Sequence, residues 1–285
     1  MTEPLVISRY QLHVSRQGQE ARAHAASYAD VFPSDRSQES DPLNACGYVH
    51  SIEVGSTVDG PGIRFVLFLT GCPLRCQYCH NPDTWHKLNG RPFTFERIMK
   101  EIEKYVEVLK ISNGGLTISG GEPVMQDVFT MRIFRRAKAL GLHTCLDTSG
   151  RLGERLSDED LFQIDLNLLD IKSGDPDIYE QVTGQPLAPT LDYARRLCAL
   201  KRPLWVRYVL VPGLTDGYDN VARVADICAG LSSLERVEVL RFHQMGLEKY
   251  HKLKIPYALE HVLPPSPELT ERVREQFRAR GLTVF

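Results

Sequence analysis

The chain has 285 residues, of which 42% are hydrophobic and 25% are charged, a composition typical of a soluble globular protein. Its 34 Lys and Arg against 36 Asp and Glu give a net charge of −2, which excludes nucleic-acid binding through a broad cationic surface. The longest apolar run, Phe65 to Leu69, is far shorter than the roughly 20 residues that cross a bilayer. Residues 1–21 lack the apolar core of a signal peptide. We therefore expect a cytoplasmic, monomeric protein without nucleic-acid or membrane partners.

The N-terminal part differs in character from the rest of the chain. Residues 1–46 are polar, and the stretch from Pro33 to Pro42 consists of proline, charged and small polar residues. We interpret 1–46 as a mobile extension. A chain of this length buries a large core without disulfide or metal staples, so we expect residues 47–285 to form one domain.

From residue 63 onward, apolar or β-branched runs alternate with amphipathic stretches, which predicts strands separated by helices. In chain order, the predicted strands are 63–70, 116–119, 143–147, 166–171, 204–211 and 237–242. The predicted helices are 94–109, 128–140, 158–164, 175–182, 191–199, 218–230 and 268–280. Near-continuous apolar strands are typical of parallel sheets that are buried on both faces. The pattern therefore favours an α/β fold, a partial (β/α)6 TIM-like barrel, with ligands at the carboxyl ends of its strands.

Three of the seven cysteines, Cys72, Cys76 and Cys79, follow the first predicted strand with the spacing C-x3-C-x2-C. Structural zinc takes four protein ligands, and the other four cysteines stand alone on separate elements, so a zinc site fits less well. Ferredoxin loops also supply four cysteines. Three thiolates suit a [4Fe–4S] cluster that keeps one iron open, and the loop therefore favours chemistry at a cluster over electron relay.

Two further motifs lie at strand ends. Gly120 and Gly121 have no Cβ, so their backbone can approach a ligand closely, although a Gly-Gly pair alone is commonly a plain turn. Asp170 and Lys172 alternate along a strand, so both side chains can face the barrel mouth while Ile171 faces the helices. A structural Asp–Lys pair is the alternative interpretation.

Together these motifs resemble the radical S-adenosylmethionine (SAM) superfamily, in which such a cysteine loop is combined with a Gly-Gly-Glu-Pro stretch, here residues 120–123. Longer stretches are similar to one family within it, the pyruvate formate-lyase activating enzymes. These stretches are GSTVDGPGIR at 55–64, YCHN at 78–81, TW at 84–85, LDT at 146–148, LDIK at 169–172 and WVRYVLVPG at 205–213. The resemblance covers residues 47–285, and the extension departs from the compact family pattern.

The resemblance implies an enzyme in which Cys72, Cys76 and Cys79 hold a [4Fe–4S] cluster and SAM chelates its open iron. The reduced cluster would cleave SAM to methionine and a 5′-deoxyadenosyl radical, with the protein positioning cofactors that carry the chemistry. The radical would abstract an α-hydrogen from a glycine of pyruvate formate-lyase and so activate it. The SAM-binding residues implied are Tyr78, His80, Gly120, Gly121, Asp170, Ile171, Lys172, Arg207 and His243.

Two more sites follow from the resemblance. Asp147, Asp170 and the carbonyls of Thr148 and Leu168 are similar to a monovalent-cation site, in which an ion would offset two carboxylates that otherwise repel. Asp59, in the loop from Val58 to Gly62, resembles the residue that meets the incoming peptide of the substrate protein.

The implied partners are pyruvate formate-lyase as protein substrate and reduced flavodoxin or ferredoxin as electron donor. Two alternatives keep the radical chemistry: activation of another glycyl-radical enzyme, or a small-molecule substrate as in 7-carboxy-7-deazaguanine synthase. Many activases of other glycyl-radical enzymes carry a cysteine-rich insert, whereas residues 80–119 contain no cysteine. A third interpretation is a metal protein that only scaffolds a partner, and it leaves the glycine pair and Asp170 unexplained.

Overall fold

The computed structural model describes residues 46–285. The predicted extension, residues 1–46, lies outside the described residues except for Cys46, which begins the first strand. Within the described part of the chain, no helix is both long and apolar enough to cross a membrane.

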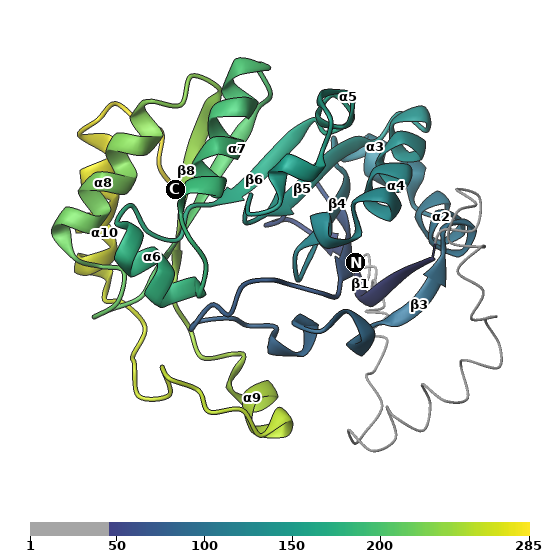
Figure 1. Ribbon diagram of the computed structural model, residues 1–285. Coiled ribbons are helices and arrows are strands. Elements are labelled where there is room, and N and C mark those ends of the chain that lie inside the picture. Colours follow the sequence, from purple (N-terminus) through teal and green to yellow (C-terminus); the bar gives the residue numbers. More distant parts are fainter. Residues whose placement is uncertain (1–45) are drawn as a thin grey trace, which may run out of the picture.

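One eight-stranded sheet organises the molecule, in the order β3-β1-β2-β4-β5-β6-β7-β8 (Figure 1). The strands are β1 Cys46–Ser56, β2 Arg64–Leu69, β3 Arg91–Thr94, β4 Gly115–Gly120, β5 His143–Thr148, β6 Leu166–Asp170, β7 Leu204–Leu210 and β8 Leu234–Arg241. Strand β2 and strands β4 to β8 are parallel, whereas β1 is antiparallel to β2 and β3. Because β3 and β8 are the two ends of this order, the barrel is not closed. The predicted partial barrel of six parallel strands is confirmed.

Helices follow strands β3 to β8, and most of them lie on the outside of the curved sheet, whereas α9 lies apart from it (Figure 1). They are α2 Phe95–Glu103, α3 Val106–Ile111, α4 Asp127–Ala139, α5 Asp158–Leu161, α6 Pro176–Thr183, α7 Ala188–Ala199, α8 Tyr218–Ala229, α9 Leu247–Leu253 and α10 Pro267–Arg278. The main 3-10 turns near the site are η3 Pro82–Thr84, η4 Lys87–Asn89 and η5 Pro123–Gln126.

The structure differs from the predicted elements in a few places. The helix predicted at 94–109 divides into α2 and α3, and the one at 158–164 has a single turn that a Ser157–Asp160 capping box begins. Strands β1 and β3 and helix α9 were not predicted. Most of β1 is only half-buried and its pairing with β2 shifts register twice, so it lacks the regular alternation by which strands are recognised.

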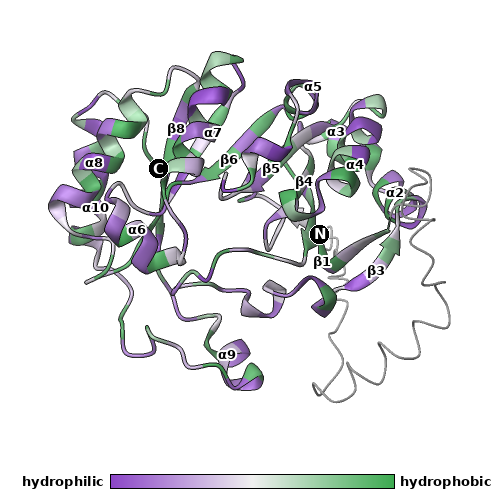
Figure 2. Ribbon diagram, viewed as in Figure 1, coloured by the Kyte–Doolittle hydropathy of each residue, from purple (hydrophilic) through white to green (hydrophobic). Residues whose placement is uncertain are grey.

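The hydrophobic core lies between the sheet and its helices. Phe65, Leu67 and Leu69 point outward from β2 and are fully buried with the apolar faces of α2 and α4. Figure 2 shows hydrophobic residues along the strands and hydrophilic ones over much of the helices. The other face of each strand lines the inside of the barrel, and there polar residues are frequent.

Arg64 on β2 is the largest fully buried side chain of the barrel interior. Its guanidinium donates to the carbonyl of Leu116 at 2.6 Å, the hydroxyl of Thr117 at 2.9 Å and the carbonyl of Pro61 at 3.3 Å. A buried arginine requires this many acceptors because unpaired donors are costly in a dry interior. Arg64 therefore ties the 59–62 loop to β4.

We expect Arg64→Met to lower the free energy of unfolding by roughly 3 kcal/mol, because several buried acceptors lose their donor. Urea unfolding measures the change. Arg195→Met is the matched control: the Arg195 side chain is 66% exposed and pairs with Asp192, so a change within about 0.5 kcal/mol is expected. Equal effects of the two substitutions would contradict the role assigned to Arg64.

Candidate active site

The three cysteines lie on one loop that crosses the barrel opening between β2 and β3 (Figure 1). Backbone bonds hold this loop at both sides. The amides of Arg75 and Gln77 donate to the carbonyls of Thr183 and Val182 at the end of α6, at 2.8 and 2.9 Å. The Cys72 amide donates to the Trp85 carbonyl at 3.0 Å. The loop is therefore a fixed element.

The thiols of this cysteine loop suit a metal cluster. Burial raises the pKa of Cys76 to about 12, and burial also raises the pKa values of Cys72 and Cys79. Each thiol is close enough to at least one of the others to influence its pKa. Cysteines that bind a metal do so as thiolates, so cluster assembly would release protons here.

Within residues 46–285, no three His, Cys, Asp or Glu side chains converge as closely as a single metal ion requires. A [4Fe–4S] cube is wider than one ion and carries one cysteine at each of its ligated corners. The donor set of three spaced cysteines therefore fits the cluster better than it fits zinc.

Gly120 packs against the backbone of Leu69 at the end of β2, and Gly121 packs against the backbone at the start of the cysteine loop. Gly120 has a φ of +113°, a conformation that favours glycine. A Cβ at Gly121 would lie 2.4 Å from the Gly71 carbonyl oxygen and 3.2 Å from that of Thr84. The Glu122 amide donates to Gly71 at 2.7 Å. The sequence indicated close approach to a ligand, and the structure adds a close approach to the start of the cysteine loop.

Glu122 ties the glycine pair to the end of β5. Its buried carboxylate accepts from the Thr148 hydroxyl at 2.7 Å and from the amide and hydroxyl of Ser149 at 3.0 and 2.5 Å. Burial raises the pKa of Glu122, and these hydrogen bonds oppose that effect. Its contacts are those of a residue that supports the loop.

We expect Gly121→Ala to displace the cysteine loop and to reduce cluster binding, because the new Cβ meets backbone rather than a flexible side chain. Iron and sulfide per chain after anaerobic reconstitution measure the effect. Gly217→Ala is the control, since the nearest atom to its Cβ would be Asn220 Cβ at 4.0 Å. Full iron content in Gly121→Ala would show that the loop tolerates the shift.

The half-buried Asp170 and the buried Lys172 form an ion pair beside the cysteines. Lys172 Nζ lies 2.8 Å from Asp170 Oδ2 and 5.6 Å from the centre of the Tyr78 ring. Although burial opposes it, Asp170 raises the pKa of Lys172 well above its ordinary value. The Ile171 side chain is fully buried in the outer core, so only its backbone can face a ligand. The Tyr78 hydroxyl is buried without a hydrogen-bond partner.

His80 and His243 meet although they are 163 residues apart. Their rings stack with centres 4.0 Å apart, and His80 Nε2 lies 3.1 Å from the His243 carbonyl oxygen. Burial lowers the pKa of both imidazoles, and at His80 the neighbouring His243 lowers it further. Two histidines predicted separately from the sequence therefore form one stacked, neutral pair.

Sequence reasoning missed the part of the chain that covers the third cysteine. Trp85 hydrogen-bonds Cys79 and packs edge-on against Tyr250 of α9, with ring centres 6.0 Å apart. A Cβ at Gly246 would lie 3.0 Å from His80 Cα. The Tyr250 hydroxyl, like that of Tyr78, is buried without a partner. The resemblance identified His243, but helix α9 after it was not predicted.

An ion pair holds α9 in this position. Lys249 Nζ lies 2.8 Å from Asn81 Oδ1 and 3.0 Å from Asp83 Oδ2, and His50 Nε2 lies 2.9 Å from the same Asp83 oxygen. These residues come from α9, the cysteine loop and β1. Of these residues only Asn81 lies in a stretch that carried the resemblance, and no sequence pattern predicts the contacts, because only the tertiary fold brings the residues together.

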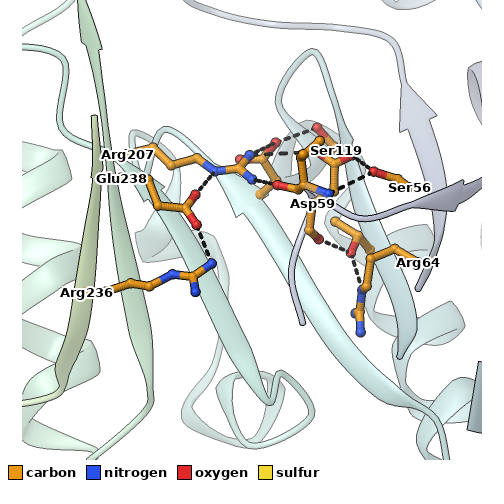
Figure 3. Close-up of polar contacts among 10 residues, drawn as sticks. Ser56, Asp59, Arg64, Ser119, Arg207, Arg236 and Glu238 are labelled. Atoms are coloured by element: carbon orange, nitrogen blue, oxygen red, sulfur yellow. Dashed lines mark hydrogen bonds and ion pairs between the residues drawn. The ribbon is translucent and has the colours of Figure 1, made fainter. Parts of the chain in front are cut away.

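Arg207 is at the centre of a charged network inside the barrel (Figure 3). It donates to the Val58 carbonyl at 2.5 Å, and its Nη1 lies 3.4 Å from Asp147 Oδ2 and 3.8 Å from Asp59 Oδ1. Ser56 donates to Asp59 at 2.5 Å. The predicted residues Asp59, Asp147 and Arg207 are thus neighbours.

At the predicted cation site, the structure places a positively charged side chain beside each of the two carboxylates, where the resemblance implied a bound cation. Asp147 accepts from Ser119 at 2.6 Å and pairs with Arg207, while Asp170 pairs with Lys172. Both carboxylates therefore have a cationic partner in the chain, and repulsion between them no longer requires an ion. A monovalent cation at Asp147, Thr148, Leu168 and Asp170 remains a prediction.

Burial raises the pKa of Asp147 from 3.8 to about 6, although Arg207 opposes the shift. Between these values the folded state binds a proton that the unfolded state has lost, so this group makes the free energy of unfolding fall as pH rises from 3.8 to about 6. We expect Asp147→Asn to remove that decline, as measured by urea unfolding across this range. The exposed Asp177→Asn is the control, and an unchanged pH slope in Asp147→Asn would contradict the assignment.

The comparisons with known proteins agree with this geometry. The 4Fe-4S single cluster domain family matches residues 58–174, which include the cysteine loop and the glycine pair. The pyruvate formate-lyase-activating enzyme of Staphylococcus epidermidis is 44% identical over 240 residues, which are 81% of this chain and 94% of that protein. The chain belongs to the pyruvate formate-lyase-activating enzyme family. The predicted resemblance is confirmed.

Solved structures show the fold that members of this family share with other radical SAM proteins. A domain of pyruvate-formate lyase-activating enzyme from Bacteroides vulgatus has a TM-score of 0.51 at 23% identity, over 60% of this chain and 98% of that one. A radical SAM methyltransferase from Sphaerobacter thermophilus has a TM-score of 0.57 at 17% identity, over 93% and 80% of the two chains. The partial barrel of this activating-enzyme family member is therefore of the radical SAM type.

Proposed function

We propose that this chain activates pyruvate formate-lyase by generating a radical on one of its glycines. The observation that carries the proposal is the position of Cys72, Cys76 and Cys79 on one fixed loop. The glycine pair lies on one side of this loop and the Asp170–Lys172 pair on the other. Family membership supports it.

The three cysteines would hold a [4Fe–4S] cluster. When bound, cluster and SAM supply the radical chemistry: one electron cleaves SAM to methionine and a 5′-deoxyadenosyl radical, which takes an α-hydrogen from the target glycine. The chain's own residues bind, orient and shield these groups. Trp85 and Tyr250 would keep water from the cysteine side of the site.

The SAM site would comprise the groups around that loop. Lys172 and Asp170 offer a fixed pair of opposite charges to the amino and carboxylate groups of SAM. Gly121 would present backbone hydrogen-bonding groups, and the stacked His80 and His243 present a flat, neutral surface for the adenine. Tyr78, Gly120, the backbone of Ile171 and Arg207 complete the proposed set.

Asp59 would meet the peptide of the substrate protein. Val58 beside it is 73% exposed, whereas the Asp59 side chain is 16% exposed and lies next to Arg207. This loop thus has one residue at the surface and the next in the barrel interior. It is suited to guide a peptide backbone inward.

The electron would come from a carrier protein, reduced flavodoxin or ferredoxin. The three cysteines are half-buried and Arg75 on their loop is exposed, which supports electron transfer from a protein bound at this surface. A monomer in the cytoplasm completes the proposal, and seven cysteines without a disulfide suit a reducing compartment.

The protein reconstituted anaerobically with iron and sulfide, reduced, and mixed with SAM and pyruvate formate-lyase is expected to give the electron paramagnetic resonance doublet of a glycyl radical. Deuterium from a labelled target glycine should appear in 5′-deoxyadenosine. Cys76→Ser should abolish both signals, while Cys198→Ser, on α7, should not. Release of 5′-deoxyadenosine without a glycyl radical would leave the radical SAM chemistry in place and overturn the proposed substrate.

A further inference from the structure

The orientation of Arg207 depends on a residue that no motif singled out. Arg207 Nε donates to Glu238 Oε2 at 3.1 Å, while its Nη groups point to Val58 and Asp147 (Figure 3). A guanidinium is planar, so a bond at Nε fixes the plane in which the Nη groups lie. Glu238 therefore holds the edge of Arg207 that faces away from the site.

Glu238 is itself held by a second arginine. Arg236 Nη2 donates to Glu238 Oε1 at 2.5 Å, so each carboxylate oxygen binds one arginine. The Glu238 side chain is only 12% exposed. A buried carboxylate placed between two guanidinium groups has both oxygens paired and little freedom to rotate.

Aromatic rings fix the outer arginine. The Arg236 guanidinium carbon lies 3.3 Å from the centre of the Trp205 ring and 4.9 Å from that of Phe285, the last residue. Arginine stacks on aromatic faces in this way. Trp205 Nε1 donates to Glu235 at 2.8 Å, which fixes the indole in turn.

The backbone of the chain end secures the strand that carries Glu238. Val237 donates to Thr283 at 2.8 Å, Phe285 donates to Val237 at 3.0 Å, and Val239 donates to Phe285 at 2.9 Å. These bonds flank Glu238 on both sides. The last three residues thus support the edge strand at the position where it touches Arg207.

We propose that Glu238 is a positioning residue for Arg207 and that Arg236 fixes Glu238 in turn. This inference rests on the proposed role of Arg207 in SAM binding. A glutamine at this position has one acceptor oxygen where the carboxylate has two, so it cannot accept from both Arg207 and Arg236, and its NH2 group would face one of the two guanidinium groups. The Nε edge of Arg207 would lose its anionic partner, and Asp147 and Asp59 would be the remaining acids that hold the guanidinium. Arg207 would then no longer present its Nη groups in the orientation that ligand binding requires.

The test compares Glu238→Gln with Glu235→Gln in the reconstituted holoenzyme. Both substitutions neutralise a carboxylate on β8, but Glu235 is not in contact with Arg207. Glu235 accepts from Trp205 Nε1, and the amide oxygen of a glutamine at this position can still accept that bond, so the indole stays in place. We expect Glu238→Gln to raise the dissociation constant of SAM, measured by calorimetry, about tenfold or more. Glu235→Gln should leave it unchanged. Equal SAM affinities in the two variants would overturn the proposal.

Kinetics separate positioning from a loss of fold. Reductive SAM cleavage without pyruvate formate-lyase should show a raised KM for SAM and a kcat within about twofold of the unsubstituted enzyme. A lowered kcat with unchanged KM would overturn the proposal. If Glu238→Gln does not fold, as shown by its thermal midpoint, Arg236→Gln decides. Arg236 contacts Glu238 but no atom of Arg207 or of the cysteine loop is among its partners. If Arg236→Gln binds SAM as tightly as Glu235→Gln does, the proposal that Arg236 fixes Glu238 is wrong.

These measurements use SAM alone, so they do not depend on the protein substrate. An enzyme that binds and cleaves SAM but forms no glycyl radical would refute the proposed function while leaving the role of Glu238 intact. Conversely, a normal glycyl radical with unchanged SAM affinity in Glu238→Gln would refute only the positioning role.

Discussion

The close approach of two backbones, at Gly121 and Gly71, is the constraint on which the rest of the site depends. It joins the end of β4 to the start of the cysteine loop through the bond from Glu122 to Gly71. From that fixed start, α6 holds the middle of the loop and α9 covers its end. A side chain at Gly121 would push the start of the cysteine loop away from β4. The position of the three cysteines therefore depends on glycine at this residue.

The charged side chains inside the barrel are arranged in pairs of opposite sign. Asp170 has Lys172, Asp147 and Asp59 share Arg207, and Glu238 bridges Arg207 and Arg236. Each ion would be costly in a dry interior on its own. A polar interior of this kind adds little to stability, and its arrangement is better understood as the requirement of a site that handles a charged ligand.

The sequence predicted the groups that local patterns can encode. The parallel strands, the cysteine spacing and the placement of Asp170 and Lys172 on the same face of one strand each depend on residues close in the chain. The ion pair between Asp170 and Lys172 was only the alternative interpretation of that placement. The contacts of Lys249 with Asp83, and of Glu238 with Arg207, depend on which distant segments the fold brings together. Strand β1 was not predicted because it is mostly half-buried and pairs irregularly, so its sequence does not alternate regularly between apolar and polar residues. The stacking of His80 on His243 was also beyond local pattern, although each residue was identified separately.

An open sheet leaves two edges that could join other sheets, and this molecule blunts both. Strand β3 has four residues and contains Pro92, which has no amide hydrogen to donate. The edge of β8 is covered by the chain's own end, Thr283 to Phe285. Each of these features reduces the number of backbone groups that an edge strand offers to another sheet. If residues 283–285 left this position, the backbone groups of Val237 and Val239 would be free to pair with a strand from another molecule.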